Sequence, residues 1–224
     1  MTVKCRRMWM GILLAVLCGG CPLSAGAITG NDVIARMQKK FAGYKTFSAK
    51  FEKQFYWALL DNKMQSRKGK IYTRRPNQFR LELENGDIVI AEGEAIWAYN
   101  KKNQQVVVSA YAGELKTPWE ILLDYTESYA PIAVEEVKLE GRPCYMLSLR
   151  SRTQGSYVEQ MKIWVDNKRW QLLKAEQREV NDNITTYILK DHRTNKKLDD
   201  ALFRFELPEG VDVIDRRDQA LRDE

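Results

Sequence analysis

The alternation of apolar and polar residues predicts a protein built mainly from β-strands. Apolar side chains occupy nearly every second position from residue 47 to 57, and Lys53 is the charged exception on that side of the segment. Turn residues such as Asn85-Gly86-Asp87 separate further runs of this kind, so we expect an antiparallel meander curled into a barrel or sandwich. These further strands are expected at 79–84, 88–90, 96–99, 106–108, 137–139, 144–149, 161–165, 172–180, 184–190 and 202–207.

Two capping signals predict helices. The segment from Thr29 to Asp32 forms a capping box, and apolar residues then follow at helical spacing as far as Gly43. Thr117-Pro118-Trp119-Glu120 predicts the start of a second helix that is apolar nearly all round. A sheet with one wet face must cover its other face, and two short helices suit a strongly curved sheet with helices on its concave side. The periodicity alone leaves open whether that concavity is filled or hollow.

The first 27 residues are typical of a secretory signal peptide. A basic stretch around Lys4 and Arg6-Arg7 precedes an apolar run at 9–17, and Ala25-Gly26-Ala27 offers a cleavage site. We therefore expect export and cleavage after Ala27. The expected parts of the chain are a signal peptide at 1–27, a single domain at 28–214 and a polar tail at 215–224.

The cysteines change the picture only slightly. Cys144 is the one cysteine after the signal peptide, so no intramolecular disulfide is expected in the mature chain. A lipid anchor on Cys21 is an alternative, although the preceding Cys18-Gly19-Gly20 is a poor match to a lipobox.

Charge argues against nucleic-acid binding. The full chain has 36 Lys and Arg against 30 Asp and Glu, but three basic residues lie in the signal peptide, which lowers the net charge from +6 to +3. The remaining charges alternate in sign along the chain, whereas a nucleic-acid protein gathers its cations on one face.

Candidate catalytic groups are scarce. The sequence contains no hydrolase elbow, phosphate loop, dinucleotide fingerprint or His-Glu-x-x-His motif. His192 lies in a polar segment and is expected to be an exposed turn residue, and Cys144 is expected to be a small buried hydrophobe. One histidine and one cysteine cannot form a structural zinc site. We therefore expect no enzyme activity, no metal site and no cofactor.

Two arginines precede a proline at a bend between strands, in Arg74-Arg75-Pro76-Asn77. A solvated basic turn is one interpretation. The other is an arginine that reaches across the mouth of a barrel and donates to carbonyl oxygens at a helix end. Consecutive strand residues face opposite sides, so only one of the two arginines can do this.

Several motifs in order resemble the outer-membrane lipoprotein carrier (LolA) family. The motifs are Gly69-Lys70-Ile71-Tyr72, Arg75-Pro76-Asn77, Glu92-Gly93, Ile96-Trp97-Ala98-Tyr99-Asn100, Thr117-Pro118-Trp119, Phe203-Arg204-Phe205 and Pro208-Glu209-Gly210-Val211. The resemblance covers about residues 31 to 215 and implies an incomplete antiparallel β-barrel with a helical lid on its concave side. It also implies a monomeric periplasmic carrier whose apolar interior shelters the acyl chains of triacylated lipoproteins. Such a carrier receives lipoproteins from an inner-membrane ABC transporter and passes them to an outer-membrane acceptor.

The resemblance also assigns roles to individual residues. It selects Arg75 as a latch that holds the lid closed, and it places Trp119 and Leu122 on cavity-facing positions of the lid helix. With the alternating apolar residues, the expected lipid-binding set is Met37, Phe41, Phe47, Phe51, Phe55, Phe79, Leu81, Leu83, Ile88, Ile90, Trp97, Trp119 and Leu122.

Other functions stay open beside the carrier. A periplasmic lipid-sensing or stress-sensing regulatory protein can use the same half-barrel to bind a partner. A glycolipid cargo is also compatible with the sequence. An enzyme on a barrel scaffold is disfavoured, because no set of acid, base and nucleophile is present.

Overall fold

One large open sheet dominates the structure. The computed structural model describes residues 27–59, 64–111 and 128–217. Within them, twelve strands form a single sheet in the order β12-β6-β5-β4-β3-β2-β1-β11-β10-β9-β8-β7. The strands are β1 (Thr46–Tyr56), β2 (Met64–Arg74), β3 (Gln78–Leu83), β4 (Ile88–Glu92), β5 (Ala95–Asn100), β6 (Gln105–Ala110), β7 (Tyr129–Leu139), β8 (Arg142–Ser151), β9 (Val158–Asp166), β10 (Leu172–Glu179), β11 (Ile184–Thr194) and β12 (Asp212–Asp215).

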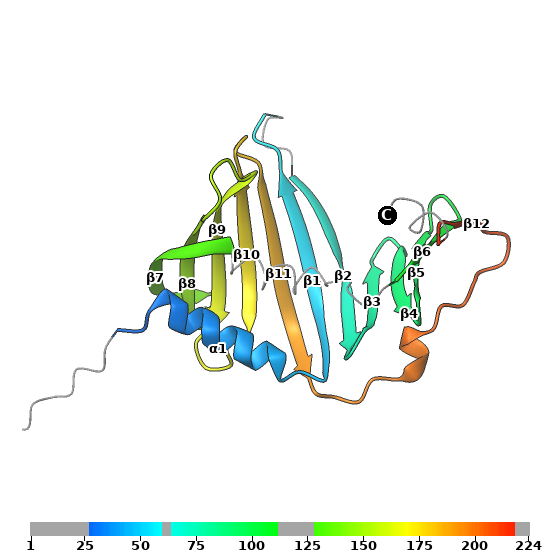
Figure 1. The fold of residues 1–224 in the computed structure, drawn as a ribbon, viewed down its shortest axis with the longest axis horizontal. Coiled ribbons are helices and arrows are strands. Elements are labelled where there is room, and N and C mark those ends of the chain that lie inside the picture. The colour runs from blue at the N-terminus through cyan, green and yellow to red at the C-terminus, as the bar shows by residue number, and fades with distance from the viewer. Residues whose placement is uncertain (1–26, 60–63, 112–127, 218–224) are drawn as a thin grey trace, which may run out of the picture.

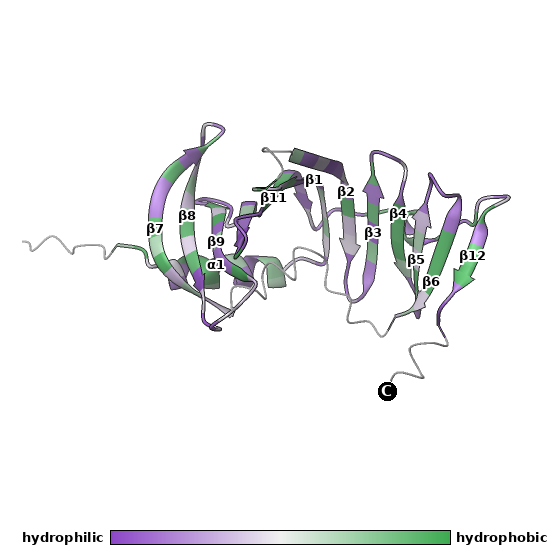
Figure 2. Ribbon diagram, turned by 90° about the horizontal axis from the view of Figure 1, so that it is seen from above, coloured by the Kyte–Doolittle hydropathy of each residue, from purple (hydrophilic) through white to green (hydrophobic). Residues whose placement is uncertain are grey.

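The sheet is strongly curved and does not close into a barrel (Figures 1 and 2). Neighbouring strands are antiparallel except that β12 runs parallel to β6. Helix α1 (Gly30–Ala42) lies along one face of the strands from β7 to β11, and this face is called the concave face below. The predicted fold class, a mainly β incomplete barrel with a helix on its concave side, is confirmed.

The first predicted helix is confirmed together with its cap. The Thr29 side chain accepts a hydrogen bond from the Asp32 amide, and the Asp32 carboxylate accepts one in return from the Thr29 amide. Val33, Ile34 and Met37 bury one side of the helix against the sheet. No helix in the described ranges has the length and hydrophobicity needed to cross a bilayer. The second predicted helix and the signal peptide lie outside the described residues, apart from Ala27.

One predicted strand is wrong, and an observed strand was not predicted. The predicted strand at 202–207 is instead a short 3-10 helix, η1 (Asp200–Phe203), because the Asp199 side chain caps it and Phe203 is buried. β2 was not predicted, because its first five residues are all exposed and therefore show no alternation of apolar and polar positions.

Candidate functional site

The concave face carries a continuous apolar surface. Residues paired across neighbouring strands point to the same side of a sheet, so the register identifies the members of each face. Buried and half-buried side chains of this face form one cluster across most of the strands. Its central members are Phe47, Ala49, Phe51, Ile71, Phe79, Leu81, Leu83, Val89, Ala91, Ile96, Leu147, Leu149, Met161, Ile163, Val165, Ala175, Tyr187 and Leu189.

Helix α1 covers part of this surface. Met37 is only 2% exposed, and Phe41 and Tyr44 at the end of the helix pack against Phe47 of β1. The Tyr44 and Phe47 rings are stacked with their centroids 5.9 Å apart. In this region the concave face is therefore a closed hydrophobic core.

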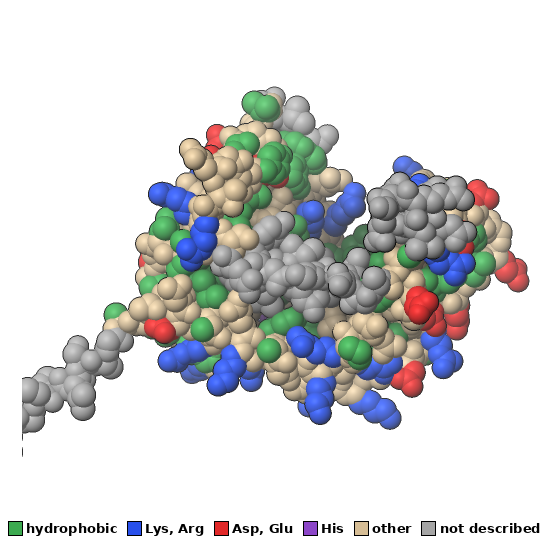
Figure 3. Space-filling model, in the orientation of Figure 1, with side chains coloured by type: hydrophobic (Ala, Val, Ile, Leu, Met, Phe, Trp, Pro, Cys, Tyr) green, Lys and Arg blue, Asp and Glu red, His purple; other side chains and the backbone are tan. Residues whose placement is uncertain are grey.

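The concave face of β3, β4 and β5 is covered less completely. Leu81, Leu83, Val89 and Ile96 are only half-buried, and no helix among the described residues lies over them. Figure 3 shows the molecule hollowed between its two halves, with apolar side chains inside the hollow. An apolar, concave and partly open surface of this kind can take up hydrocarbon chains.

Most of the described residues in the predicted lipid-binding set lie in the apolar cluster of the concave face. Phe55 also belongs to the concave side and packs against Trp57, with 4.5 Å between the ring centroids, near the far end of β1. Trp119 and Leu122 lie outside the described residues. The members that share the concave cluster are Met37, Phe41, Phe47, Phe51, Phe79, Leu81 and Leu83.

The assignment of Ile88, Ile90 and Trp97 to this face is wrong. In the β3–β4 hairpin, Leu81 pairs with Val89 and Phe79 with Ala91, so Ile88 and Ile90 point to the other side. Trp97 pairs with Ile90 and follows it to that side. Leu83 and Asp87 lie opposite each other across the turn, so odd-numbered residues stay on one face of this hairpin, and the even-numbered Ile88 and Ile90 could not join Leu81 and Leu83. In the next hairpin Ala91 pairs with Ile96, so the concave face passes to even-numbered residues and excludes Trp97.

That opposite face has a small core of its own. Trp97 stacks on Phe205 at 5.1 Å, and Val106 and Val108 are buried beside it. Arg80 donates from a terminal nitrogen to the Leu202 carbonyl oxygen at 3.1 Å and so links β3 to η1. The segment after β11 therefore covers the face of β3–β6 that lies opposite the concave face.

Arg74 and Arg75 face opposite sides, as expected. Arg74 donates to the Asp200 carboxylate at 2.5 Å and its guanidinium lies 4.7 Å from the Phe203 ring centroid, on the η1 side. The exposed Arg75 guanidinium lies 5.8 Å from the Phe41 ring centroid, on the α1 side. Its predicted partner, the second helix, lies outside the described residues, so the latch stays a prediction.

His192 differs from its predicted position in an exposed turn. It lies in β11, where Asp191 adopts a positive φ of 56° and the pairing with β1 is irregular, which turns the half-buried imidazole toward Phe47. Its Nε2 lies 3.0 Å from the Leu172 carbonyl oxygen. Burial lowers the pKa of His192, and the hydrogen bond to Leu172 opposes this shift only in part. The neutral ring therefore suits the apolar end of the site.

Cys144 agrees with its predicted role as a small buried hydrophobe. It is 1% exposed and unpaired, and burial raises the pKa of its thiol, so it is a poor nucleophile. In the part of the chain that the structure describes, no three His, Cys, Asp or Glu residues are grouped so that they could hold a metal ion.

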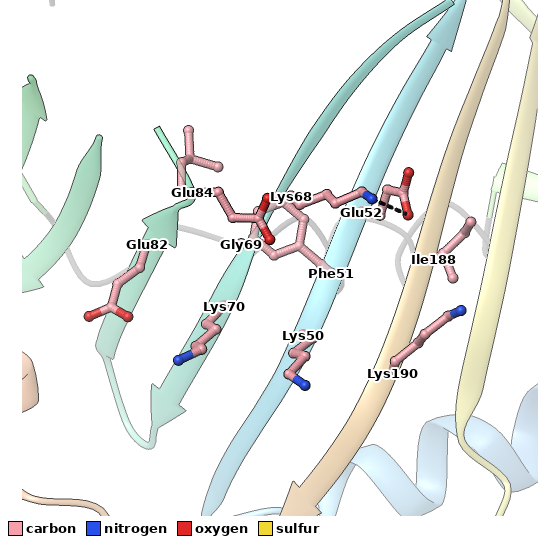
Figure 4. A pocket seen from close by; sticks show the side chains of 11 residues that line it. Lys50, Phe51, Glu52, Lys68, Gly69, Lys70, Glu82, Glu84, Ile188 and Lys190 are labelled. Atoms are coloured by element: carbon pink, nitrogen blue, oxygen red, sulfur yellow. Dashed lines mark ion pairs between the residues drawn. The ribbon is translucent and has the colours of Figure 1, made fainter. Parts of the chain in front are cut away.

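Charged residues of β1, β2, β3 and β11 that point away from the concave face line an open groove of about 470 Å³, to which Phe51, Gly69 and Leu83 also contribute (Figure 4). Lys50 and Lys70 pair directly across β1 and β2 there, and Lys50 forms an ion pair with Asp191 at 2.7 Å. The two faces of the same strands therefore differ sharply in polarity.

The family model described as "Outer membrane lipoprotein carrier protein LolA" matches residues 42–206. The chain belongs to the LolA family. Members of the LolA family are carriers rather than enzymes, and the open sheet with α1 on its concave face agrees with that family.

Curated relatives of this LolA-family chain are distant in sequence. It is 26% identical over 193 residues to an outer-membrane lipoprotein carrier protein of Histophilus somni, covering 85% of this chain and 91% of the relative. It is 25% identical over 209 residues to the protein MJ0687 of Methanocaldococcus jannaschii, covering 91% of this chain. The match spans only 58% of MJ0687.

Solved structures show the same LolA-type fold. A conserved protein from Thermus thermophilus superposes with a TM-score of 0.54 at 14% identity, covering 83% of this chain and 98% of that protein. MucB, in the Pseudomonas aeruginosa MucA/MucB complex, superposes with a TM-score of 0.50 at 14% identity, covering 78% of this chain and 60% of MucB.

Several residues of the LolA-type concave face were missed in the sequence analysis. Val89, Ile96, Tyr187 and Leu189 all belong to the apolar cluster. Val89 would have been found by counting turn residues, because Leu83 lies opposite Asp87 and odd-numbered residues stay together across the β3–β4 turn. Ile96 would have been found in the same way, because the β4–β5 hairpin pairs Ala91 with Ile96 and passes the face to even-numbered residues.

Proposed function

We propose that this protein is a periplasmic carrier that shelters the acyl chains of lipoproteins on its concave face and moves them from the inner to the outer membrane. Its cargo would be triacylated lipoproteins, its donor an inner-membrane ABC transporter and its acceptor a protein of the outer membrane. Membership of the LolA family supports the class of function.

The observation that carries this proposal is the half-buried apolar surface of β3–β5 on the concave side. Each CH₂ group removed from water contributes about 0.8 kcal/mol, so three acyl chains of ~16 carbons represent roughly 40 kcal/mol of exposure. A carrier must replace much of this burial and still release its cargo. A partly open apolar face, which shelters chains less completely than a bilayer does, suits both requirements.

The first test places a charge on each face of the sheet. Leu81→Glu puts a carboxylate on the concave face, whereas Ile188→Glu puts one among the charged side chains of the opposite face. We expect Leu81→Glu to weaken binding of a fluorescent triacylated lipopeptide at least tenfold and Ile188→Glu to bind like the wild type. Circular dichroism checks that both variants are folded. Equal loss in both variants, or no loss in either, would contradict the proposed site.

The second test concerns the latch. We propose that Arg75, on the α1 side of the sheet, restrains the lid, and that Arg74 has no part in release. Arg75→Leu should slow the release of a radiolabelled lipoprotein to outer-membrane vesicles, and Arg75→Lys should do so partially because an ammonium lacks the planar fork. Arg74→Leu should release cargo at the wild-type rate, although it loses its contacts with Asp200 and Phe203. Slow release by Arg74→Leu together with wild-type release by Arg75→Leu would show that Arg75 is not the latch.

A regulatory binding protein is the second candidate. The similarity of fold to MucB, which was solved in complex with MucA, favours it. Mass spectrometry of the protein purified from periplasm distinguishes the two functions. Bound triacylated lipoprotein supports the carrier, and a stoichiometric anti-sigma factor without lipoprotein supports the regulator.

A further inference from the structure

Two cations face each other within the apolar concave surface. Lys53 of β1 pairs directly with Arg67 of β2. Strand alternation places both on the same side as Phe51 and Phe55, which precede and follow Lys53 by two residues. At the concave positions of β1, β2, β3 and β11, Lys53 and Arg67 are the charged side chains.

This pairing is unfavourable for the empty protein. Like charges directly opposite on neighbouring strands destabilise a sheet. Among the described residues neither cation has an ion-pair partner, and the contact that Lys53 makes is with the face of Tyr187, 5.5 Å from the ring centroid. On the opposite face of the same strand, Lys50 also lies opposite Lys70 and Lys190, but there Lys50 forms an ion pair with Asp191 at 2.7 Å and Lys190 forms one with Glu140 at 2.8 Å.

The pair is also accessible. β3 pairs with β2 only from Gly69 to Arg74, so the part of β2 that carries Arg67 extends beyond β3. Lys53 and Arg67 are both exposed. Figure 3 shows Lys and Arg side chains at the hollow of this face. A ligand chain that lies along Phe51 and Leu83 would therefore bring its polar end within reach of both cations.

We propose that Lys53 and Arg67 bind the phosphate headgroup of an amphiphile whose hydrocarbon chain lies on the concave face. This inference rests on the proposed apolar lipid site, and it adds an anionic lipid as a second ligand, because the acylated cysteine of a lipoprotein carries no phosphate. The planar guanidinium of Arg67 can donate two parallel hydrogen bonds to phosphate oxygens, and the Lys53 ammonium adds a second positive charge. The bound phosphate would relieve the repulsion between the two cations.

The test compares two ligands that differ only in the phosphate. Palmitoyl lysophosphatidic acid and monopalmitoylglycerol, each below its critical micelle concentration, are titrated into the delipidated full-length mature protein by calorimetry. We expect the phosphate-bearing lipid to bind at least tenfold more tightly. In the double variant K53Q/R67Q the two lipids should bind with affinities within twofold of each other.

The matched control is K50Q/K70Q, which removes the same charge from the same two strands on the opposite face. It should keep the full preference for the phosphate-bearing lipid, and a loss of preference there would overturn the proposal as a non-specific effect of net charge. Inorganic phosphate alone should bind at least a hundredfold more weakly than the phosphate-bearing lipid. Comparable binding of inorganic phosphate would mean a free-anion site and would also overturn the proposal.

The remaining outcomes separate this inference from the function on which it rests. If the wild type binds both lipids equally well, the headgroup site is refuted and the carrier function stands. If it binds neither lipid but still binds the triacylated lipopeptide, the headgroup site is refuted and the carrier function stands. If it binds none of the three, both are refuted.

Discussion

The two halves of the sheet are covered on opposite faces. Over β7–β11, α1 packs on the concave face and completes a closed core there. Over β3–β6, η1 and the segment that follows it pack on the other face, against Ile90 and Trp97. The concave face of β3–β5 is thereby left half-buried. Apolar residues of the same type thus serve stability in one half and are available to a ligand in the other.

The largest expected effect is the loss of stability when an apolar side chain is truncated in the half covered by α1, compared with the same kind of truncation on the concave face of β3–β5. Met37→Ala leaves a cavity beneath α1 and should lower the free energy of unfolding by about 2–5 kcal/mol. Leu83→Ala, at a half-buried position, should cost less than about 1.5 kcal/mol. Urea unfolding of the two variants measures the difference. Equal costs would mean that the concave face of β3–β5 is a packed core.

Gly69 of β2, which lies between the two halves, allows β1 and β3 to pack closely around it. A Cβ atom at this position would collide with the Glu82 carbonyl oxygen and lie 2.8 Å from Cε1 of Phe51. Gly69→Ala should therefore lower the free energy of unfolding by about 1–3 kcal/mol, as overpacking does. Gly43→Ala is the control, because its added Cβ would make only ordinary contacts. If both substitutions lower the free energy of unfolding by the same amount, the close packing of Phe51 and Glu82 around Gly69 does not account for the loss of stability.

The half-buried His192 predicts a pH dependence for the α1 half. Its pKa in the folded protein lies below the ordinary value of 6.5, so the unfolded chain binds the proton more readily. The corresponding stability is fully present above pH 6.5 and is lost as the pH falls from there toward the lower folded pKa. The wild type should therefore lose more stability than His192→Gln between about pH 7.5 and about pH 5.5, as measured by thermal unfolding. Parallel pH profiles for the two proteins would contradict this expectation.

The smallest effect concerns the cation pair of the concave face. Lys53→Gln or Arg67→Gln removes a like-charge repulsion and should raise the stability of the lipid-free protein by about 0.2–1 kcal/mol at low salt. The gain should shrink as salt screens the charges. Lys50→Gln should give no net gain, because the lost ion pair with Asp191 offsets the relieved repulsion from Lys70 and Lys190. A loss of stability in the Lys53 and Arg67 variants would show that the two charges have compensating partners.

The local sequence was sufficient to predict elements but not the side on which each residue lies. Alternation predicted β1, and the capping box predicted α1, because both signals act over a few neighbouring residues. β2 escaped prediction because its exposed first half has no apolar face to show. Ile88, Ile90 and Trp97 were assigned to the wrong face because the number of residues in each turn sets the facing of the next strand. Odd-numbered residues stay together across the β3–β4 turn, whereas the β4–β5 turn pairs Ala91 with Ile96.

The sequence by itself determined most of the strands, the first helix, the apolar content of the sheet and the family resemblance, since each of these is recorded in short-range patterns. Only the tertiary structure decided which half of the concave face is closed by α1, which arginine faces η1, that His192 is turned inward, and that Lys53 meets Arg67. These features depend on strand register and on contacts between residues far apart in the chain, such as Arg80 with Leu202. Strand periodicity cannot encode them, because it repeats every two residues whatever lies on either side of the sheet.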